Sequence, residues 1–210
     1  MSTKENEITV RDRTANPAPL GLLGFGMTTM MLSLHNAGYI SLGAAILALG
    51  MVFGGSAQMM AGVMEWKKGN TFGTTAFISF GAFWLAVVAI LLFPTMGLSG
   101  AETTEAMACF FLLWGIFSAF LTVGTLNTNR IMQMVFLTLT IVFFLLAASE
   151  ALVSSDIKSI AGHLGLLTGA LAFYLAMAQV LNESLGRTVV PIFPVALRKE
   201  RGSKDDPIAH

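Results

Sequence analysis

Six long apolar stretches, separated by short polar ones, restrict this chain to a fold that crosses a lipid bilayer. They cover residues 19–34, 40–64, 71–92, 107–126, 131–148 and 160–181. A helix of about 20 apolar residues spans a membrane and satisfies its own backbone hydrogen bonds there. Only 11% of the residues are charged, whereas a soluble domain carries about 25%. We therefore predict an all-α membrane protein with six transmembrane helices around a narrow central path.

The lysines and arginines orient these helices. An even number of spans puts both termini on one side, and Lys158 is then the only one of the 12 lysines and arginines in a loop on the other side. Cytoplasmic segments carry an excess of such residues. We therefore predict N and C termini in the cytoplasm of a protein of the inner (plasma) membrane. Residues 1–15 and 187–210 are then cytosolic tails, and residues 16–186 form the six-helix transmembrane domain.

Residues 16–29, NPAPLGLLGFGMTT, join the N-terminal tail to the first apolar stretch. Proline lacks an amide proton and suits the first turn of a helix, so a helix is expected to begin near Pro19. Glycines at positions 21, 24 and 26 let another backbone approach closely. This stretch is shorter than the others, so either its helix ends early or residues 35–39 dip into the membrane. Glycine-rich faces recur along the chain, and there are more of them than six helices around one narrow path need. This excess favours contacts between subunits.

Four sequence blocks resemble the acetate uptake transporter family, the YaaH-type succinate–acetate permeases. The first is the stretch just described, and the others follow in order: LHNAGY at 34–39, AQMMAGVMEWKKGNTFGTTAF at 57–77 and LNESLGRTVVPI at 181–192. The resemblance covers residues 16–192. It implies proton-coupled transmembrane transport of acetate, with succinate and other small carboxylates as further substrates, and assembly into a homohexamer.

The resemblance also implies a pore constriction built from Phe25, Phe80 and Leu139. Phe80 stands where the family usually has tyrosine, so the constriction is expected to be drier. A hydrophobic constriction gates by dewetting and opposes a charged solute more than a neutral one. Ala172 matches a position associated with substrate size in the family, although a small residue there can also serve ordinary helix packing.

Neutral polar residues, rather than charged ones, lie within the apolar stretches. No Asp, Glu, Lys or Arg falls near the middle of any stretch, so a relay of ionisable groups across the membrane is not expected. Hydroxyls and amides can hydrogen-bond a small carboxylate or its acid, but they also join helices or bond to their own backbone. We place on the substrate path, besides the constriction, Asn16, Thr28, Thr29, His35, Asn36, Gln58 and Ala172. His35 and Asn36 form either an entrance vestibule or a structural turn, and Glu65 with Lys67 and Lys68 is expected to be an interfacial anchor.

Sequence motifs of enzymes and metal sites are absent. The chain has no serine elbow, no phosphate-binding glycine–lysine loop and no paired histidines, cysteines or carboxylates at metal spacing. We therefore predict no enzymatic activity, no cofactor, no metal and no nucleic-acid partner. Two alternatives to acetate transport stay open. One is a channel for a small neutral solute or ammonia, favoured by the uncharged path, and the other is a membrane scaffold or sensor whose tails bind a partner.

Single cysteines at positions 99 and 203, in a background without Cys109, test the orientation. With the termini inside, a membrane-impermeant thiol reagent should label the Ser99→Cys protein on intact cells. It should label the Ser203→Cys protein only after the membrane is permeabilised. Labelling of position 203 on intact cells would show that the termini lie outside and that the predicted orientation is wrong.

Overall fold

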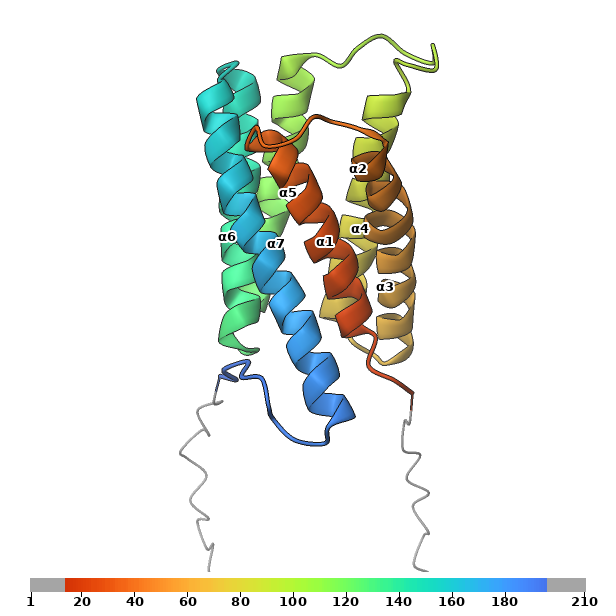
Figure 1. Cartoon of the computed structure of the whole chain (residues 1–210), viewed down its shortest axis with the longest axis vertical. Coiled ribbons are helices and arrows are strands. Elements are labelled where there is room, and N and C mark those ends of the chain that lie inside the picture. Colours follow the sequence, from red (N-terminus) through yellow and green to blue (C-terminus); the bar gives the residue numbers. More distant parts are fainter. Residues whose placement is uncertain (1–13, 196–210) are drawn as a thin grey trace, which may run out of the picture.

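The computed structural model describes residues 14–195, which form helices running roughly side by side along one axis (Figure 1). In chain order they are α1 (Ala18–Asn36), α2 (Ala44–Leu49), the π-helix η1 (Gly50–Ala57), α3 (Gln58–Lys67), α4 (Thr71–Leu92), α5 (Thr104–Gly124), α6 (Arg130–Ala151) and α7 (Ser155–Ser184). α2, η1 and α3 follow one another without a break and form one rod. Between residues 14 and 195 the only extended pairing is an isolated antiparallel bridge of Asn129 with Pro194.

All six apolar stretches are helical, which confirms the predicted all-α architecture. Within the described residues, five helical segments are long and apolar enough to cross a membrane, namely the rod 44–67 and helices α4 to α7. α1 is not among the five. Its 19 residues still reach about 28 Å at 1.5 Å per residue. That length is close to the hydrocarbon thickness of about 30 Å, and α1 packs against α7, the rod and α4.

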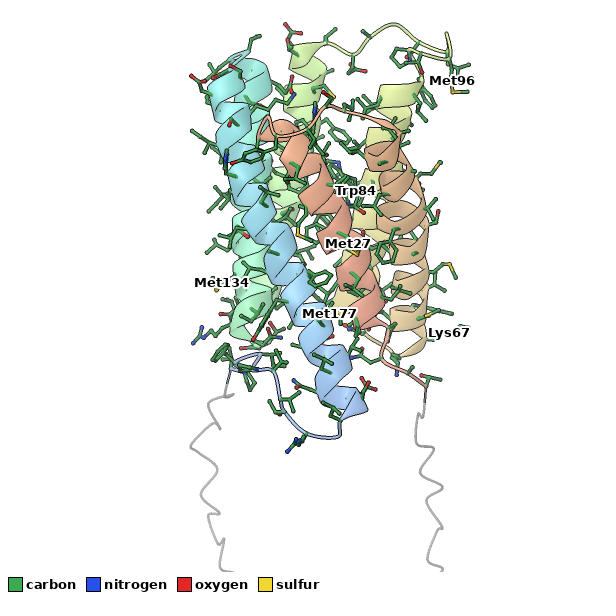
Figure 2. The ribbon with its side chains drawn as sticks, viewed as in Figure 1. Met27, Lys67, Trp84, Met96, Met134 and Met177 are labelled. Carbon is green, nitrogen blue, oxygen red and sulfur yellow. The ribbon has the colours of Figure 1, made fainter. Side chains whose placement is uncertain are left out.

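Both ends of the described chain lie at the same end of the bundle, the lower end in Figure 1. Lys67, which ends α3, lies at this lower end, and Met96, which follows α4, lies at the upper end (Figure 2). Residues 1–13 and 196–210 are outside the described range. The predicted N-terminal tail and most of the predicted C-terminal tail therefore fall outside it.

Helix ends differ from the sequence-based expectation where a capping side chain or a turn sets them. α1 continues through Asn36, so it does not end early, and an exposed turn then leads to α2 at Ala44 instead of position 40. α7 begins at Ser155 instead of position 160, because the Ser154 hydroxyl accepts a hydrogen bond from the Ile157 amide at 3.4 Å. A side-chain acceptor at this position satisfies an amide that the first helical turn leaves unpaired.

α1 and α7 meet backbone to backbone. A Cβ atom added to Gly26 would lie 2.8 Å from the Gly169 carbonyl oxygen, and one added to Gly169 would lie 2.7 Å from the Gly26 carbonyl oxygen. Nearer the upper end, a Cβ on Gly162 would overlap the backbone of Ala37. Lipid tails are as apolar as leucine, so helices in a bilayer associate through such close packing. Any side chain at these glycines would push α1 away from α7.

Glycines serve the interior of the protomer in each described helix that contains them. Each helical glycine between residues 14 and 195 has a neighbour from this same chain within contact distance of an added Cβ. Gly54 of η1 faces Thr28 of α1, for example, and Gly81 of α4 faces Gly55 of η1. The expectation that glycine-rich faces exceed what one bundle needs was therefore wrong, and these faces give no support to contacts between subunits.

Threonine hydroxyls join α5, α6 and α7. Thr122 and Thr140 link α5 to α6 at 3.0 Å, and Thr168 on α7 donates to Thr138 on α6 at 2.9 Å. Thr140 and Thr168 also bond to carbonyls four residues earlier in their own helices. For these residues the structural role of a buried hydroxyl is confirmed.

The segment after α7 folds back under the bundle. The Asn182 side chain accepts from the amides of Val189 and Val190 at 2.7 and 2.9 Å and donates to the Val190 carbonyl at 2.7 Å. Further along, the Phe193 carbonyl accepts from the Arg130 amide at 3.0 Å. Residues 187–195, which the sequence placed in the C-terminal tail, therefore connect the end of α7 to the start of α6.

Candidate substrate path

A cavity of about 60 Å³ lies near the lower end of the bundle, between α1, α3, α4 and α6. We call it the lower cavity. Its wall is mostly apolar, and its residues are Ala18, Leu22, Phe25, Gln58, Glu65, Asn70, Phe72, Gly73, Ala76, Phe77, Phe80, Met132, Val135, Phe136 and Leu139. The polar side chains among them, Gln58, Glu65 and Asn70, all come from α3 and the turn that follows it. The cavity is therefore an apolar pocket with one polar side, as is usual for a small-molecule site.

Glu65 is buried in the wall of the lower cavity, with 3% of its surface exposed. Its carboxylate accepts a hydrogen bond from the Asn70 side-chain amide at 2.7 Å. The Asn70 side-chain oxygen in turn accepts from the Gly73 amide at 3.0 Å and so caps α4. The expectation that Glu65 is an interfacial anchor was wrong, because the turn between α3 and α4 holds it against the cavity.

Two buried polar atoms near the lower cavity have no hydrogen-bond partner among the described residues. They are the side-chain oxygen of Gln58, a residue only 1% exposed, and the hydroxyl of Thr29, which is 7% exposed. Gln58 lines the lower cavity. Buried polar groups are nearly always paired, so these two atoms are suited to a polar solute or to water.

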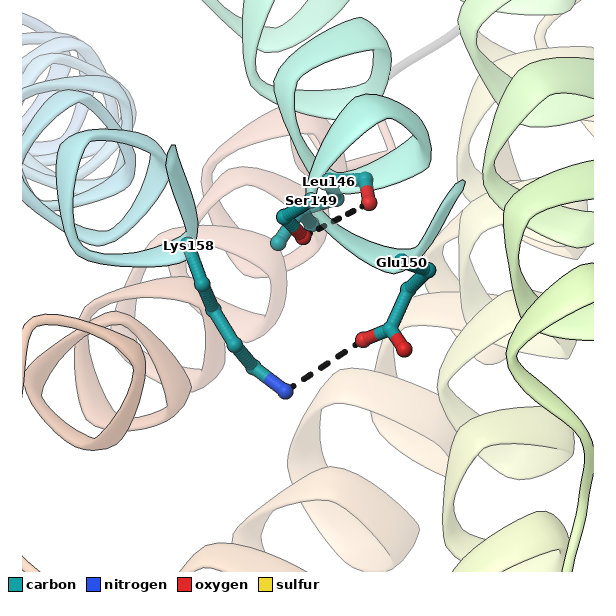
Figure 3. A network of polar contacts seen from close by, with 4 residues as sticks. All are labelled: Leu146, Ser149, Glu150 and Lys158. Atoms are coloured by element: carbon teal, nitrogen blue, oxygen red, sulfur yellow. Dashed lines mark hydrogen bonds and ion pairs between the residues drawn. The ribbon is translucent and has the colours of Figure 1, made fainter. Parts of the chain in front are cut away.

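A second cavity, of about 120 Å³, lies near the upper end, and we call it the upper cavity. Its apolar wall comes largely from α4 and α5, including Phe83 and Phe111. His35 and Asn36 reach it from the end of α1, Glu150 from the end of α6, and Lys158 from the start of α7. The Lys158 ammonium and the Glu150 carboxylate form an ion pair at 3.3 Å (Figure 3).

Aromatic rings separate the two cavities, and we call this group the aromatic plug: Phe25, Phe80, Phe83, Trp114 and Phe143. Phe25 and Phe80 line the lower cavity, with ring centroids 5.8 Å apart, while Phe83 lines the upper one. Phe143 lies 6.3 Å from Phe80 and 5.2 Å from Phe83, and Trp114 lies 5.8 and 5.1 Å from the same two rings. The plug offers ring faces and edges, and no charged group, to a solute between the cavities.

Three helices carry one continuous face from the lower cavity to the upper one. Residues three or four apart lie on the same side of a helix. The faces are Leu22, Phe25, Thr29, Leu32 and Asn36 on α1, Ala76, Phe80, Phe83, Val87 and Ile90 on α4, and Met132, Phe136, Leu139, Phe143, Leu146 and Glu150 on α6. The cavities thus lie along one line through the bundle, and the unpaired Thr29 hydroxyl belongs to the face that connects them.

The structure brings together seven of the residues placed on the path by sequence. Phe25, Gln58, Phe80 and Leu139 line the lower cavity, His35 and Asn36 line the upper cavity, and Thr29 lies on the α1 face between them. His35 also has a structural contact, because its Nδ1 lies 3.1 Å from the Ile40 carbonyl oxygen in the turn after α1.

The remaining path residues lie elsewhere. Asn16 is exposed, and its side chain accepts from the Ala18 amide at 3.1 Å where α1 begins. Thr28 is fully buried between α1 and η1, where its hydroxyl donates to the Leu49 carbonyl at 3.4 Å. Ala172 is fully buried where α1 meets α7, and a Cβ added to Gly26 would lie 3.2 Å from the Cβ of Ala172. Within residues 14–195, these three line neither cavity.

Sequence reasoning missed most of the aromatic plug and the charged residues of both cavities. A spacing signal existed: Phe83 follows Phe80 by one turn, and Glu65 follows Gln58 by two. Each therefore lies on a face already assigned to the path. Glu150 and Lys158 gave no such signal, because they lie on different helices. Among the described residues no three His, Cys, Asp or Glu side chains gather closely enough to hold a metal ion.

Comparison with known proteins identifies the family. Residues 3–196 match the model of the GPR1/FUN34/yaaH family. The chain belongs to this family. It is 53% identical over 180 residues to the succinate-acetate/proton symporter SatP of Escherichia coli K12, covering 86% of this chain and 96% of that one. It is also 33% identical over 191 residues to the ammonia transport outward protein 2 of Saccharomyces cerevisiae, covering 87% and 67%.

A solved structure of the bacterial acetate channel SatP has the same fold. It matches with a TM-score of 0.85 and 53% sequence identity, covering 86% of this chain and 99% of that one. The match extends over the transmembrane bundle of this GPR1/FUN34/yaaH protein. A multi-pass membrane protein built on this bundle is therefore established by its apolar helices and by its relatives together.

Leu139→Ala should relax size selection at the lower cavity. Leu139 is 3% exposed and lines the cavity beside the plug, so removing its side-chain carbons enlarges the space available to a solute. We expect uptake of propionate relative to acetate to rise by roughly tenfold, the low end of what one methylene contributes in an apolar pocket. Competition between the two labelled acids in vesicles measures the ratio.

Leu137→Ala is the matched control, because Leu137 is on the same helix but 52% exposed. Its ratio should equal that of the unaltered protein. A Leu139→Ala protein that folds normally and keeps the original ratio would assign Leu139 to packing instead of to the path.

Proposed function

We propose that this protein transports acetate across the membrane, with succinate and other small carboxylates as further substrates. The observation that carries the proposal is the pair of cavities that approach each other from opposite ends of the bundle and are separated by the aromatic plug. Such a path serves a small solute that passes one barrier. The names of the 53% identical symporter and of the acetate channel with the same fold support the choice of acetate.

The constriction of Phe25, Phe80 and Leu139 is part of this proposal. Phe25 and Phe80 also belong to the plug, and Leu139 lies beside them on the α6 face. An ionised carboxylate that leaves water without a counter-charge has a large desolvation cost. The neutral acid loses only hydrogen bonds there, and Thr29 and Gln58 carry oxygens close to the plug that have no partner within residues 14–195. A carboxylate that takes up a proton before it reaches the plug therefore crosses at a lower free energy.

Proton coupling follows from the same barrier. The plug has no side chain that could hold a charge midway, so a proton and an anion cross most easily as one neutral molecule. Glu65, 3% exposed and bonded to Asn70, is suited to receive the proton at the lower cavity. The path then moves one proton with each monocarboxylate, which agrees with the name of the symporter relative.

We further propose a location in the inner (plasma) membrane with both termini in the cytoplasm. The distribution of lysines and arginines supports this orientation, and the lower cavity is then the cytoplasmic one. Assembly into a homohexamer is also proposed. It is supported by the family resemblance alone, since the helical glycines are used within the protomer.

Ammonia transport is the second candidate function. It is favoured by the uncharged plug, which opposes a small neutral base no more than a neutral acid, and by the relative named as an ammonia transport protein. A carboxylate and ammonia differ in the proton movement that accompanies them. Uptake of acetic acid acidifies a vesicle, whereas uptake of ammonia makes it alkaline.

Purified protein in liposomes tests the proposed function. With an acidic exterior, protein-containing vesicles should take up labelled acetate faster than protein-free ones and acidify an internal pH dye. Excess propionate or succinate should compete, and glycerol should not. Acetate uptake equal to that of protein-free vesicles, together with dye alkalinisation when an ammonium salt is added, would establish the ammonia function instead.

Phe80→Tyr should raise acetate flux most at neutral to alkaline external pH. The new hydroxyl can donate to a carboxylate at the plug, and a hydrogen bond to a charged group contributes about 1.5–3 kcal/mol, partly offset by displaced water. At low pH more of the solute is already neutral, so the gain should shrink. The measurement is initial acetate uptake against external pH at matched protein content.

Phe120→Tyr on α5 is the control, because Phe120 is 76% exposed on the outside of the bundle. It should leave the pH profile unchanged. A Phe80→Tyr gain that is equal at every pH would show that position 80 does not meet the solute.

A further inference from the structure

The geometry points to the upper cavity as a carboxylate-binding site in which Glu150 occupies the place of the solute. In the structure Lys158 is paired with Glu150. We infer that the carboxylate of an incoming solute replaces Glu150 as the partner of Lys158, and that Glu150 takes up the proton that accompanies the anion. The inference rests on the proposed function and names residues that would select and load its substrate.

The ion pair lies where a solute enters the path. Glu150 is at the end of α6, Lys158 is in the first turn of α7, and their Oε1 and Nζ atoms are 3.3 Å apart in the wall of the upper cavity. In Figure 3 the two side chains reach toward each other across the space between the helices, while Ser149 bonds instead to the Leu146 carbonyl at 2.8 Å. Among the side chains drawn there, Lys158 and Glu150 are the two that pair with each other between the helices.

Burial differs between the two partners. The Glu150 side chain is 18% exposed and the Lys158 side chain 42%. The charged form of a carboxylate as buried as Glu150 becomes unfavourable once its counter-ion, Lys158, pairs with another anion. Lys158 is exposed enough to meet a solute from water. The more exposed partner thus receives the solute, and the more buried one is left to be neutralised.

Other charged or titratable groups around the upper cavity are few. From α1 the group is His35, whose Nδ1 lies 3.1 Å from the Ile40 carbonyl. A carbonyl only accepts, so Nδ1 is the donor in this contact and is already engaged. From α4 and α5 the lining residues are apolar, including Phe83, Val87 and Phe111. Among the described lining residues, Lys158 is then the ammonium donor for a carboxylate.

Two further groups near this end of α7 do not line the cavity. Asp156 is exposed in the first turn of α7. His163 is paired with Tyr39, whose hydroxyl lies 3.0 Å from its Nε2, and its own Nδ1 lies 2.8 Å from the Ser159 carbonyl. Neither group takes part in the exchange at Lys158.

Charge is conserved in the proposed exchange. Before binding, the Lys158 ammonium and the Glu150 carboxylate sum to zero. The solute brings one negative charge to Lys158, and one proton from the medium moves to a Glu150 oxygen, so the site again sums to zero. Transfer of that proton from Glu150 to the bound carboxylate restores the Lys158–Glu150 pair and releases a neutral acid toward the plug. Anion and proton thus enter the path in a ratio of one to one.

Acetate binding to purified full-length protein tests this inference without a need for transport. Broadening of the acetate methyl NMR signal on addition of protein gives the dissociation constant, and a pH dye in weak buffer gives the protons taken up. Lys158→Gln should weaken acetate binding by about tenfold, the low end of the range for a charged hydrogen bond. Lys158→Arg should restore most of the binding. Asp156→Asn, a neutralisation on the same helix away from the cavity, should change neither quantity.

Glu150→Gln separates the proton from the anion. The unaltered protein should bind acetate more tightly as the pH falls from 8 to 6 and should take up protons when acetate is added. Glu150→Gln should bind acetate tightly throughout this range, with a flat pH profile and no proton uptake. Thermal unfolding of each variant in detergent identifies those that remain folded, and Lys158→Arg covers the case in which Lys158→Gln does not fold.

Two results would overturn the inference: acetate binding that is unchanged in folded Lys158→Gln, or pH dependence that persists in Glu150→Gln. The proposed function fails in a different way, because protein-containing liposomes would then take up no more acetate than protein-free ones. Acetate transport that survives with unaltered half-saturation in Lys158→Gln would leave the function standing and exclude this site.

Discussion

Close contact between the backbones of α1 and α7 is the constraint on which the path depends. Gly26 and Gly169 approach each other so closely that a Cβ on either would meet the carbonyl oxygen of the other. α1 also receives η1 on another side, where Gly54 accommodates Thr28. Because helices in lipid gain little from burying apolar area, small residues decide where they can touch. α1 is thereby held between α7 and the rod, with its Phe25–Thr29–Leu32 face turned toward the cavities.

The position of α1 then determines which side chains meet the path. Thr28 and Thr29 are adjacent in sequence, yet Thr28 bonds to the Leu49 carbonyl of the rod while Thr29 has no partner among the described residues. Successive helical residues differ by about 100° around the axis, so a small rotation of α1 would exchange their environments. The glycine contacts fix that rotation, and with it the polar group that the path presents next to the plug.

The sequence predicted the architecture because hydropathy and helix length act locally along the chain. The six apolar stretches and the bonding of threonines to their own turns needed no knowledge of neighbours, whereas the choice of Phe25 and Phe80 came from the family resemblance. Glu65 needed such knowledge: its sequence neighbours Lys67 and Lys68 indicate an interface, and only the return of Asn70 to cap α4 buries it. The placement of Ala172 and Thr28 also depends on neighbouring helices. A small or hydroxylated residue suits a helix contact as well as a pore, so the residue type alone does not separate the two. The pairing of Glu150 with Lys158 depends on how the ends of α6 and α7 are placed, which no spacing in the sequence encodes.

Charge is confined to the two ends of the path, and this distribution limits how a carboxylate can cross. At the upper end Glu150 and Lys158 neutralise each other, and at the lower end Glu65 is held by a neutral amide. Between them, the plug of Phe25, Phe80, Phe83, Trp114 and Phe143 has quadrupolar rings but no group that could balance a bare anion. An anion alone would meet its highest free energy where the protein offers the least compensation, whereas an acid formed at one end and ionised at the other would not. A path of this kind would need titratable groups only at its mouths, so the scarcity of charged residues within the helices is compatible with the proposed coupling of a carboxylate to a proton.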